Sequence, residues 1–131
     1  MRDLVNSINP KRGFSPVASA QTDNTAIVSQ IVNVQGYNSL TLLIATGTLA
    51  DADATFTLLV EHGDASNLSD AAAVPDEMLI GTEALASFTF AGDDKVFKIG
   101  YCGPRNYVRA TITPATTTTT TRTAHSIDSD P

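Results

Sequence analysis

Two stretches of this chain match chemical motifs in residue type and spacing. Asp51-Ala52-Asp53-Ala54-Thr55 fits the Asp-x-Asp-x-Thr pattern of magnesium-dependent phosphatases, in which the first Asp attacks phosphorus and the second transfers a proton. That chemistry requires the motif at the end of a parallel strand in an α/β domain, and this chain is too short and too rich in β-formers to supply one. We therefore interpret Asp51 and Asp53 as turn residues whose carboxylates bond nearby backbone amides.

The remaining polar residues also lack the partners that catalysis or metal binding needs. The Asp51 stretch begins like a calcium-binding loop, but Phe56 replaces the required glycine and His62 replaces the bidentate glutamate. Cys102 and His125 could form a thiol nucleophile and its base, yet no third group is evident that would orient the histidine. Neither histidine has metal-ligand spacing, and there is no glycine-rich phosphate loop. The sequence thus predicts a protein that is not an enzyme, with no catalytic, cofactor-binding or metal-binding residues.

The elements that position these residues are strands. Residues 40–45 are apolar on both faces, which predicts a strand in the middle of a sheet. In residues 54–62, Phe56, Leu58 and Val60 alternate with polar residues, so they share one face of a strand. A Gly- and Asp-containing turn joins the two runs, and we expect them to form an antiparallel hairpin.

Further strands are predicted in most of the remaining chain, at residues 26–34, 77–81, 86–90, 96–101 and 107–113. Residues 70–73 are expected to form one helical turn that Pro75 ends, and Pro114 is expected to stop the last of these strands. The pattern predicts an all-β protein, an antiparallel β-sandwich or jelly roll with an extended N-terminal arm. Its expected core consists of Ile31, Leu42, Ile44, Phe56, Leu58, Val60, Phe88, Phe97, Val108 and Ile112.

The chain divides by composition into an arm at residues 1–24, a sandwich domain at residues 25–114 and a threonine-rich strand or tail at residues 115–131. The arm is turn-rich and combines basic with apolar side chains, which suits contact with a partner. We expect that residues 1–17 can be deleted without loss of a core strand. The predicted partner-binding residues are Arg2, Leu4, Ile8, Lys11, Arg12 and Phe14.

Charge and composition restrict the partners. The 131 residues carry a formal net charge of −6, with eleven acidic residues and no Lys or Arg between Arg12 and Lys95. Such a body repels a phosphate backbone, so we expect no nucleic-acid partner. No apolar run reaches membrane-spanning length or resembles a signal peptide, and the single Cys102 cannot form an internal disulfide. We expect no membrane partner, and synthesis in a cytosol-like compartment.

Five separated stretches are familiar together and in this order. They are residues 3–10 (DLVNSINP), 34–40 (VQGYNSL), 51–57 (DADATFT), 79–83 (LIGTE) and 98–109 (KIGYCGPRNYVR). The chain resembles a family of small virion structural proteins of tailed bacteriophages. The resemblance extends nearly to Pro114, and the chain departs from the family's pattern in residues 116–131, which are threonine-rich and acidic.

The resemblance implies a capsid decoration (cement) protein that binds the shell of major capsid protein and stabilises the head. It further implies a homo-oligomer, with a trimer favoured, located on the capsid surface and made in the host cytoplasm. The alternative is a head–tail connector or a tail-associated β module that binds a receptor or carbohydrate. Sugar-binding faces usually expose aromatic rings, and this chain has no Trp and only Tyr37, Tyr101 and Tyr107.

Overall fold

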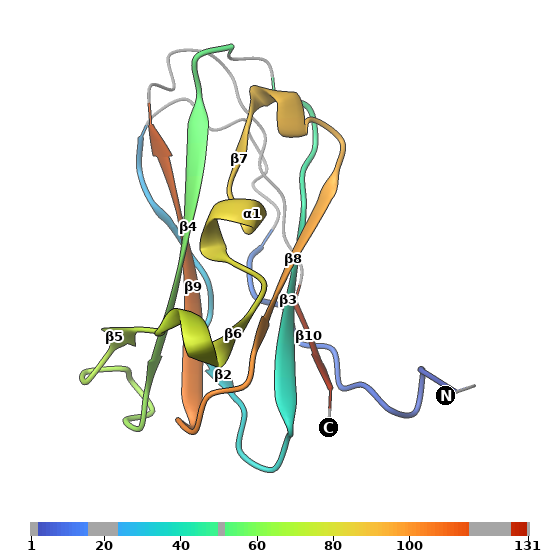
Figure 1. Cartoon of the computed structure of the whole chain (residues 1–131), viewed down its shortest axis with the longest axis vertical. Helices are drawn as coiled ribbons and strands as arrows, with labels where there is room; N and C mark the ends of the chain where they lie inside the picture. Colours follow the sequence, from blue (N-terminus) through green and yellow to red (C-terminus); the bar gives the residue numbers. More distant parts are fainter. Residues whose placement is uncertain (1–2, 16–23, 50–51, 116–126, 131) are drawn as a thin grey trace.

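Two antiparallel sheets form the protein in a computed structural model that describes residues 3–15, 24–49, 52–115 and 127–130. One sheet contains β1 (Ile27–Val28), β2 (Val32–Asn33), β4 (Thr55–Gly63), β5 (Ala72–Ala73), β7 (Phe88–Thr89) and β9 (Tyr107–Ala115). The other contains β3 (Ser39–Ala45), β6 (Leu79–Ile80), β8 (Val96–Tyr101) and β10 (Ile127–Asp130). Figure 1 shows the two sheets side by side, with β4 and β9 in one and β3, β8 and β10 in the other. The prediction of an all-β antiparallel sandwich is confirmed.

The core lies between the two sheets because each central strand turns one alternate face inward. β4 pairs with β9 along its whole length, with Leu58 opposite Ile112, and β3 pairs with β8, with Leu42 opposite Ile99. β3 lies between β10 and β8, so its predicted position in the middle of a sheet is confirmed. Of the ten predicted core residues, eight are buried: Leu42, Ile44, Phe56, Leu58, Val60, Phe88, Val108 and Ile112.

The predicted hairpin between residues 40–45 and 54–62 is wrong, because β3 and β4 belong to opposite sheets. The chain between them crosses the sandwich, and its Leu49 and Ala54 are buried. The amide of Leu49 donates to the Asp93 carboxylate at 2.6 Å, which ties the crossing to the segment before β8. Alternation along a strand reveals which face is buried, but it does not reveal which strand is the partner.

Ile31 was expected in the core and is instead exposed, because a β-bulge precedes β2. β1 places Ile27 opposite Ile112, whereas β2 places Val32 opposite Val108, so the register against β9 shifts by one residue. One extra residue between two paired segments reverses the faces of the residues that follow. Val32 and Val34 therefore point inward, and Ile31 points outward.

Three smaller predictions also need correction. Residues 70–73 contain β5 rather than a helical turn. The short α-helix lies later in the chain, at α1 (Glu83–Ala86). The Thr82 hydroxyl caps its first turn by accepting a hydrogen bond from the Leu85 amide at 3.1 Å. Phe97 is only partly buried and packs against the core. Pro114 lies within β9, opposite Phe56, and does not end the strand as predicted. It lies beyond the residues of β9 that pair with β1, so its missing N–H removes no hydrogen bond between β9 and β1.

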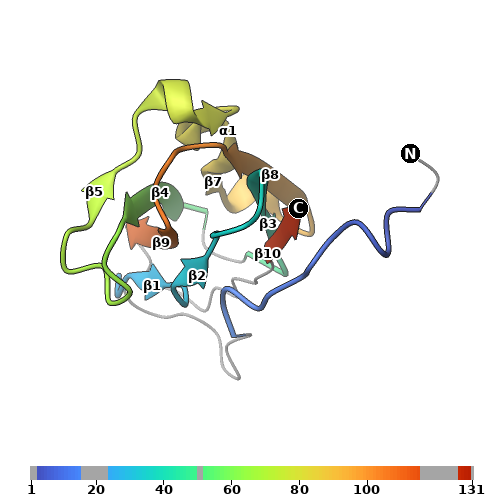
Figure 2. The ribbon, with the colours of Figure 1, turned by 90° about the horizontal axis from the view of Figure 1, so that it is seen from below.

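Side chains cap the middle of the outer edge of β4, where no strand pairs with it. β7 and β5 pair only with the two ends of β4. Between them, the Leu58 amide donates to the Ser87 hydroxyl at 2.9 Å, and the Val60 amide donates to the Glu83 carboxylate at 2.6 Å. Seen from below, α1 bridges the gap between the two sheets on this side (Figure 2). Two further short helices, η1 (Asp76–Met78) and η2 (Phe90–Gly92), lie before β6 and after β7.

Both ends of the chain contribute to the sandwich. β9 extends through Ala115, one residue past the predicted domain boundary, and β10 in the predicted tail pairs with β3. At the other end, Gly13 accepts a hydrogen bond from the Gln30 amide at 2.8 Å, and Phe14 is buried in the core. The described part of residues 1–24 is therefore anchored at its inner end.

Candidate interaction surface

The structure describes one member of each motif pair. Asp53 lies at an exposed position just before β4, in an antiparallel sandwich that lacks the parallel strand end of a phosphatase site, and Asp51 lies outside the described residues. Cys102 is exposed, with its thiol 3.4 Å from the Met78 carbonyl oxygen, and His125 also lies outside the described residues. Among the residues that the structure describes, no three His, Cys, Asp or Glu side chains gather as metal ligands.

His62 is a buried link between the two sheets. Its Nδ1 lies 2.9 Å from the hydroxyl of Tyr101, so β4 and β8 are joined across the core. Burial, and then the nearby Arg105 guanidinium, lower the pKa of His62, while burial raises the pKa of Tyr101. The neutral forms of both rings are thereby favoured. This arrangement stabilises the sandwich and leaves no reactive group open to solvent.

Ion pairs fix the loop that follows β4. Arg105 lies 2.9 Å from Asp64 and 3.8 Å from Asp70, and the Asp70 carboxylate accepts the amides of Asp64 and Ala65. Those amides lower the pKa of Asp70. A side chain at Gly63 would place its Cβ only 2.4 Å from an Asp70 oxygen, so glycine is required for this close approach. The charged residues of this loop thus hold one another in place.

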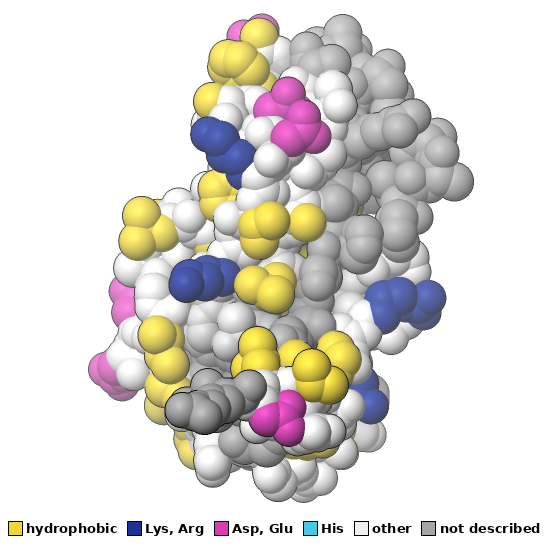
Figure 3. Space-filling model, turned by 90° about the vertical axis from the view of Figure 1, so that its right-hand side faces the viewer, with side chains coloured by type: hydrophobic (Ala, Val, Ile, Leu, Met, Phe, Trp, Pro, Cys, Tyr) yellow, Lys and Arg dark blue, Asp and Glu magenta, His cyan; other side chains and the backbone are white. Residues whose placement is uncertain are grey.

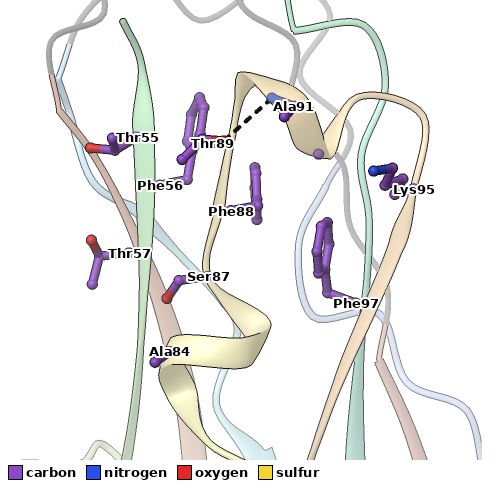
Figure 4. Close-up of a pocket in the computed structure, with 11 residues that line it drawn as sticks. Thr55, Phe56, Thr57, Ala84, Ser87, Phe88, Thr89, Ala91, Lys95 and Phe97 are labelled. Atoms are coloured by element: carbon purple, nitrogen blue, oxygen red, sulfur yellow. Dashed lines mark hydrogen bonds between the residues drawn. The ribbon is translucent and has the colours of Figure 1, made fainter.

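One end of the sandwich opens into a hollow of about 460 Å³ between β4 and β8 (Figure 4). Its aromatic rings stack in a row, with the Phe56 and Phe88 centroids 4.8 Å apart and those of Phe88 and Phe97 5.2 Å apart. Lys95 is the one charged residue in its lining. The hollow can contact an apolar group, but the residues that line it include no acid–base pair.

The predicted partner-binding residues of the arm separate into exposed and buried positions. Leu4 is 60% exposed, Lys11 and Arg12 are exposed, and Ile8 is half-buried. Phe14 is only 3% exposed and packs in the core of its own chain, so its prediction as a partner contact is corrected. Arg2 lies outside the described residues.

The outer part of the arm forms a turn and extends away from the body. Asp3 accepts the backbone amide of Asn6 at 3.2 Å and also bonds its side chain, and Ser7 donates its hydroxyl to the Asp3 carbonyl at 2.9 Å. The Asn6 contacts lower the pKa of the Asp3 carboxyl. Figures 1 and 2 show the arm leaving the body on the side of β10 and β3 and extending outward. The neighbouring Val5, which the sequence also suggests as an apolar anchor of the arm, is 82% exposed.

A second exposed apolar surface lies on the outward face of β6 and β8. A groove of about 590 Å³ there, the outer groove, is lined chiefly by Thr41, Ile80, Leu85, Val96, Lys98 and Gly100. Figure 3 looks onto this side of the molecule and shows hydrophobic side chains interspersed with Lys and Arg. Sequence reasoning missed the groove because Leu85 belongs to an unpredicted helix and Ile80 to an edge strand of two residues.

No known family model matches the chain, and no curated protein is significantly similar to it. In the described part of the chain, no helix is both long and apolar enough to cross a membrane.

Proposed function

We propose that this protein is a non-enzymatic virion structural protein of a tailed bacteriophage, most specifically a capsid decoration (cement) protein. In this role it binds the shell of major capsid protein from outside and stabilises the head. The proposal further includes a homo-oligomer, with a trimer favoured, and synthesis in the host cytoplasm before assembly onto the capsid surface. It includes no nucleic-acid or membrane partner.

The observation that carries the proposal is the arm, which is anchored at Phe14 and exposes Leu4 and Val5 far from its own core. Apolar side chains on a projecting segment are suited to a contact with another protein, since their burial there is favourable. The resemblance of the five sequence stretches to a virion family supplies the kind of partner. The antiparallel sandwich around Asp53, which is unlike the parallel α/β site of a phosphatase, supports the non-enzymatic role.

Binding to shells tests the role directly. Shells assembled from the major capsid protein of the same phage are mixed with the full chain, sedimented and analysed for bound protein. We expect saturable binding and a higher disassembly temperature of the decorated shell. The decoration role would be refuted if the shell bound none of the protein at about 100 μM, which is about 100 times a micromolar dissociation constant.

The alternative role, a connector or tail-associated β module that binds a receptor or carbohydrate, predicts a different location. Gold-labelled antibody against the protein should cover the heads of virions if the protein decorates the capsid. Label confined to the neck or the tail tip would instead favour the alternative. Among the described tyrosines, Tyr101 is buried and Tyr37 and Tyr107 are half-buried, so the exposed aromatic platform of many sugar sites is not formed by them.

A further inference from the structure

The outer groove is an uncovered apolar surface with one positive charge. Ile80 is 61% exposed, Leu85 is 75% exposed and Val96 is 67% exposed, and all three line the same hollow. Single exposed apolar residues are ordinary on a protein surface, whereas several around one groove indicate a contact site. Lys98 lies among them, opposite Leu43 in the β3–β8 register, and no carboxylate of the described residues forms an ion pair with it.

The outer arm has the complementary character. Leu4 and Val5 are adjacent apolar side chains, and the Asp3 carboxylate beside them is exposed. The bonds from Asn6 and Ser7 to Asp3 hold this tip in one turn, which reduces the conformational entropy lost on docking. Within the described part of the tip, Asp3 offers a carboxylate beside the apolar groups, while the groove offers apolar groups and the Lys98 ammonium. Arg2, which precedes Asp3 in the sequence, lies outside the described residues.

The geometry points to a second copy of this chain as the occupant of the groove. We propose that Leu4 and Val5 of one copy lie in the outer groove of another, with the Asp3 carboxylate facing Lys98. The arm leaves the body on the side of β10 and β3, at the opposite edge of this sheet from β6, and extends outward from the body (Figures 1 and 2).

Arm and groove are different patches of the same chain, so two copies can exchange arms reciprocally, or copies can join head to tail into a ring or an open filament. A closed ring of three corresponds to the favoured trimer. The arm of each copy fills a groove in the next, and no groove in the closed assembly remains uncovered. This inference rests on the homo-oligomer of the proposed function and supplies its contact. The shell-binding experiment does not depend on that contact, so failure of the arm exchange and failure of the decoration role can be distinguished.

Cysteine cross-linking tests the contact between copies. In a Cys102→Ser background, a chain carrying Leu4→Cys is mixed with a chain carrying Val96→Cys under mild oxidation. We expect a disulfide-linked pair to form at least about tenfold faster than with a Val28→Cys partner, because disulfides need close Cβ atoms. Val28 is 53% exposed on the other sheet and serves as the matched control. Equal rates for the two mixtures would overturn the proposal.

A chain that carries both cysteines distinguishes exchange from folding back of the arm. If the arm reaches the groove of its own chain, the disulfide forms within one chain and dilution favours it. A product that is monomeric at all concentrations would therefore contradict the exchange between copies. We expect covalent dimers or trimers instead. Either stoichiometry supports the proposal.

Sedimentation of the full chain measures the strength of association. We expect an oligomer at micromolar concentration, with Val5→Asp and Val96→Asp each weakening association at least about tenfold, or about 1.4 kcal/mol. Val28→Asp should leave association unchanged. Asp3→Lys and Lys98→Asp should each weaken it, and the two together should restore it, because the charges are exchanged. A wild-type chain that is monomeric at about 100 μM, or groove variants that associate normally, would refute the exchange.

Discussion

Replacement of Phe14 by alanine tests whether the arm is part of the folded core. The side chain is only 3% exposed and belongs to the same buried cluster as Val32 and Val34. Its neighbour Gly13 accepts the Gln30 amide at 2.8 Å, so side chain and backbone together attach the arm to the strands. Removal of the ring leaves a cavity that the sandwich fills only partly, because the surrounding strands are held by their own ladders.

The expected loss of stability is large. A buried Phe→Ala change costs about 3–5 kcal/mol, against a total unfolding free energy of roughly 5–15 kcal/mol for a domain. At a few degrees per kcal/mol for a chain of this length, the melting temperature should fall by roughly 10–20 °C. Urea unfolding followed by circular dichroism and tyrosine fluorescence measures the free-energy change directly.

Leu4→Ala is the control, measured at concentrations too low for copies to associate. Its side chain is 60% exposed in the single chain, so its loss should there change stability by no more than about 0.5 kcal/mol. Deletions sharpen the comparison. Removal of residues 1–10 should leave stability nearly unchanged, whereas removal of residues 1–17 also removes Phe14 and should cost as much as the point substitution. A Phe14→Ala protein within about 1 kcal/mol of the wild type would refute this reasoning.

Three other changes test the core, the buried histidine and the motif residues. Leu58→Ala should lower the unfolding free energy by about 2–5 kcal/mol in urea titrations, and the exposed neighbour substitution Thr57→Ala by far less. The pKa of His62 in the folded chain is lowered below 6.5, so just below that pH the unfolded chain binds more protons than the folded chain. The free energy of unfolding should therefore fall as the pH decreases through 6.5. His62→Gln should flatten this pH dependence in thermal melts. Changing Asp51 and Asp53 together to Asn should leave stability and shell binding unaltered, and loss of a measurable phosphatase activity in that variant would show that the turn interpretation is wrong.

The strands of this fold could be predicted from the sequence, but their partners could not. The alternation of Phe56, Leu58 and Val60 indicated both β4 and its buried face, because residues two positions apart in a strand lie on the same face of the sheet. It carried no information on pairing, and a short loop suggested a hairpin where the chain in fact crosses between sheets. The exposure of Ile31 depends on a one-residue bulge against β9, which is a property of the pairing rather than of residues 26–34.

The surface was harder to predict than the core. Composition singled out the arm, yet the sequence placed Phe14 with Leu4 as equivalent apolar anchors, and only tertiary packing separates them. The outer groove depends on Ile80 and Leu85 meeting Val96 from three different elements. No local sequence pattern indicates that these three residues lie together, because each is ordinary among its sequence neighbours and only the tertiary fold brings them into one groove.

The pairing of β4 with β9 has a consequence for how the chain is made. Leu58 is opposite Ile112, and nearly half the chain must be synthesised between the two residues. At about 5–20 residues per second this interval is roughly 3–11 s, during which β4 lacks its long partner β9 and can pair only with the two-residue strands β5 and β7. Such long-range pairing also slows folding itself, into the range of milliseconds to seconds that is typical of β-sandwiches. The edge of β4 that later pairs with β9 therefore stays open for seconds in each nascent chain, which favours pairing between neighbouring chains on one polysome until Ile112 emerges.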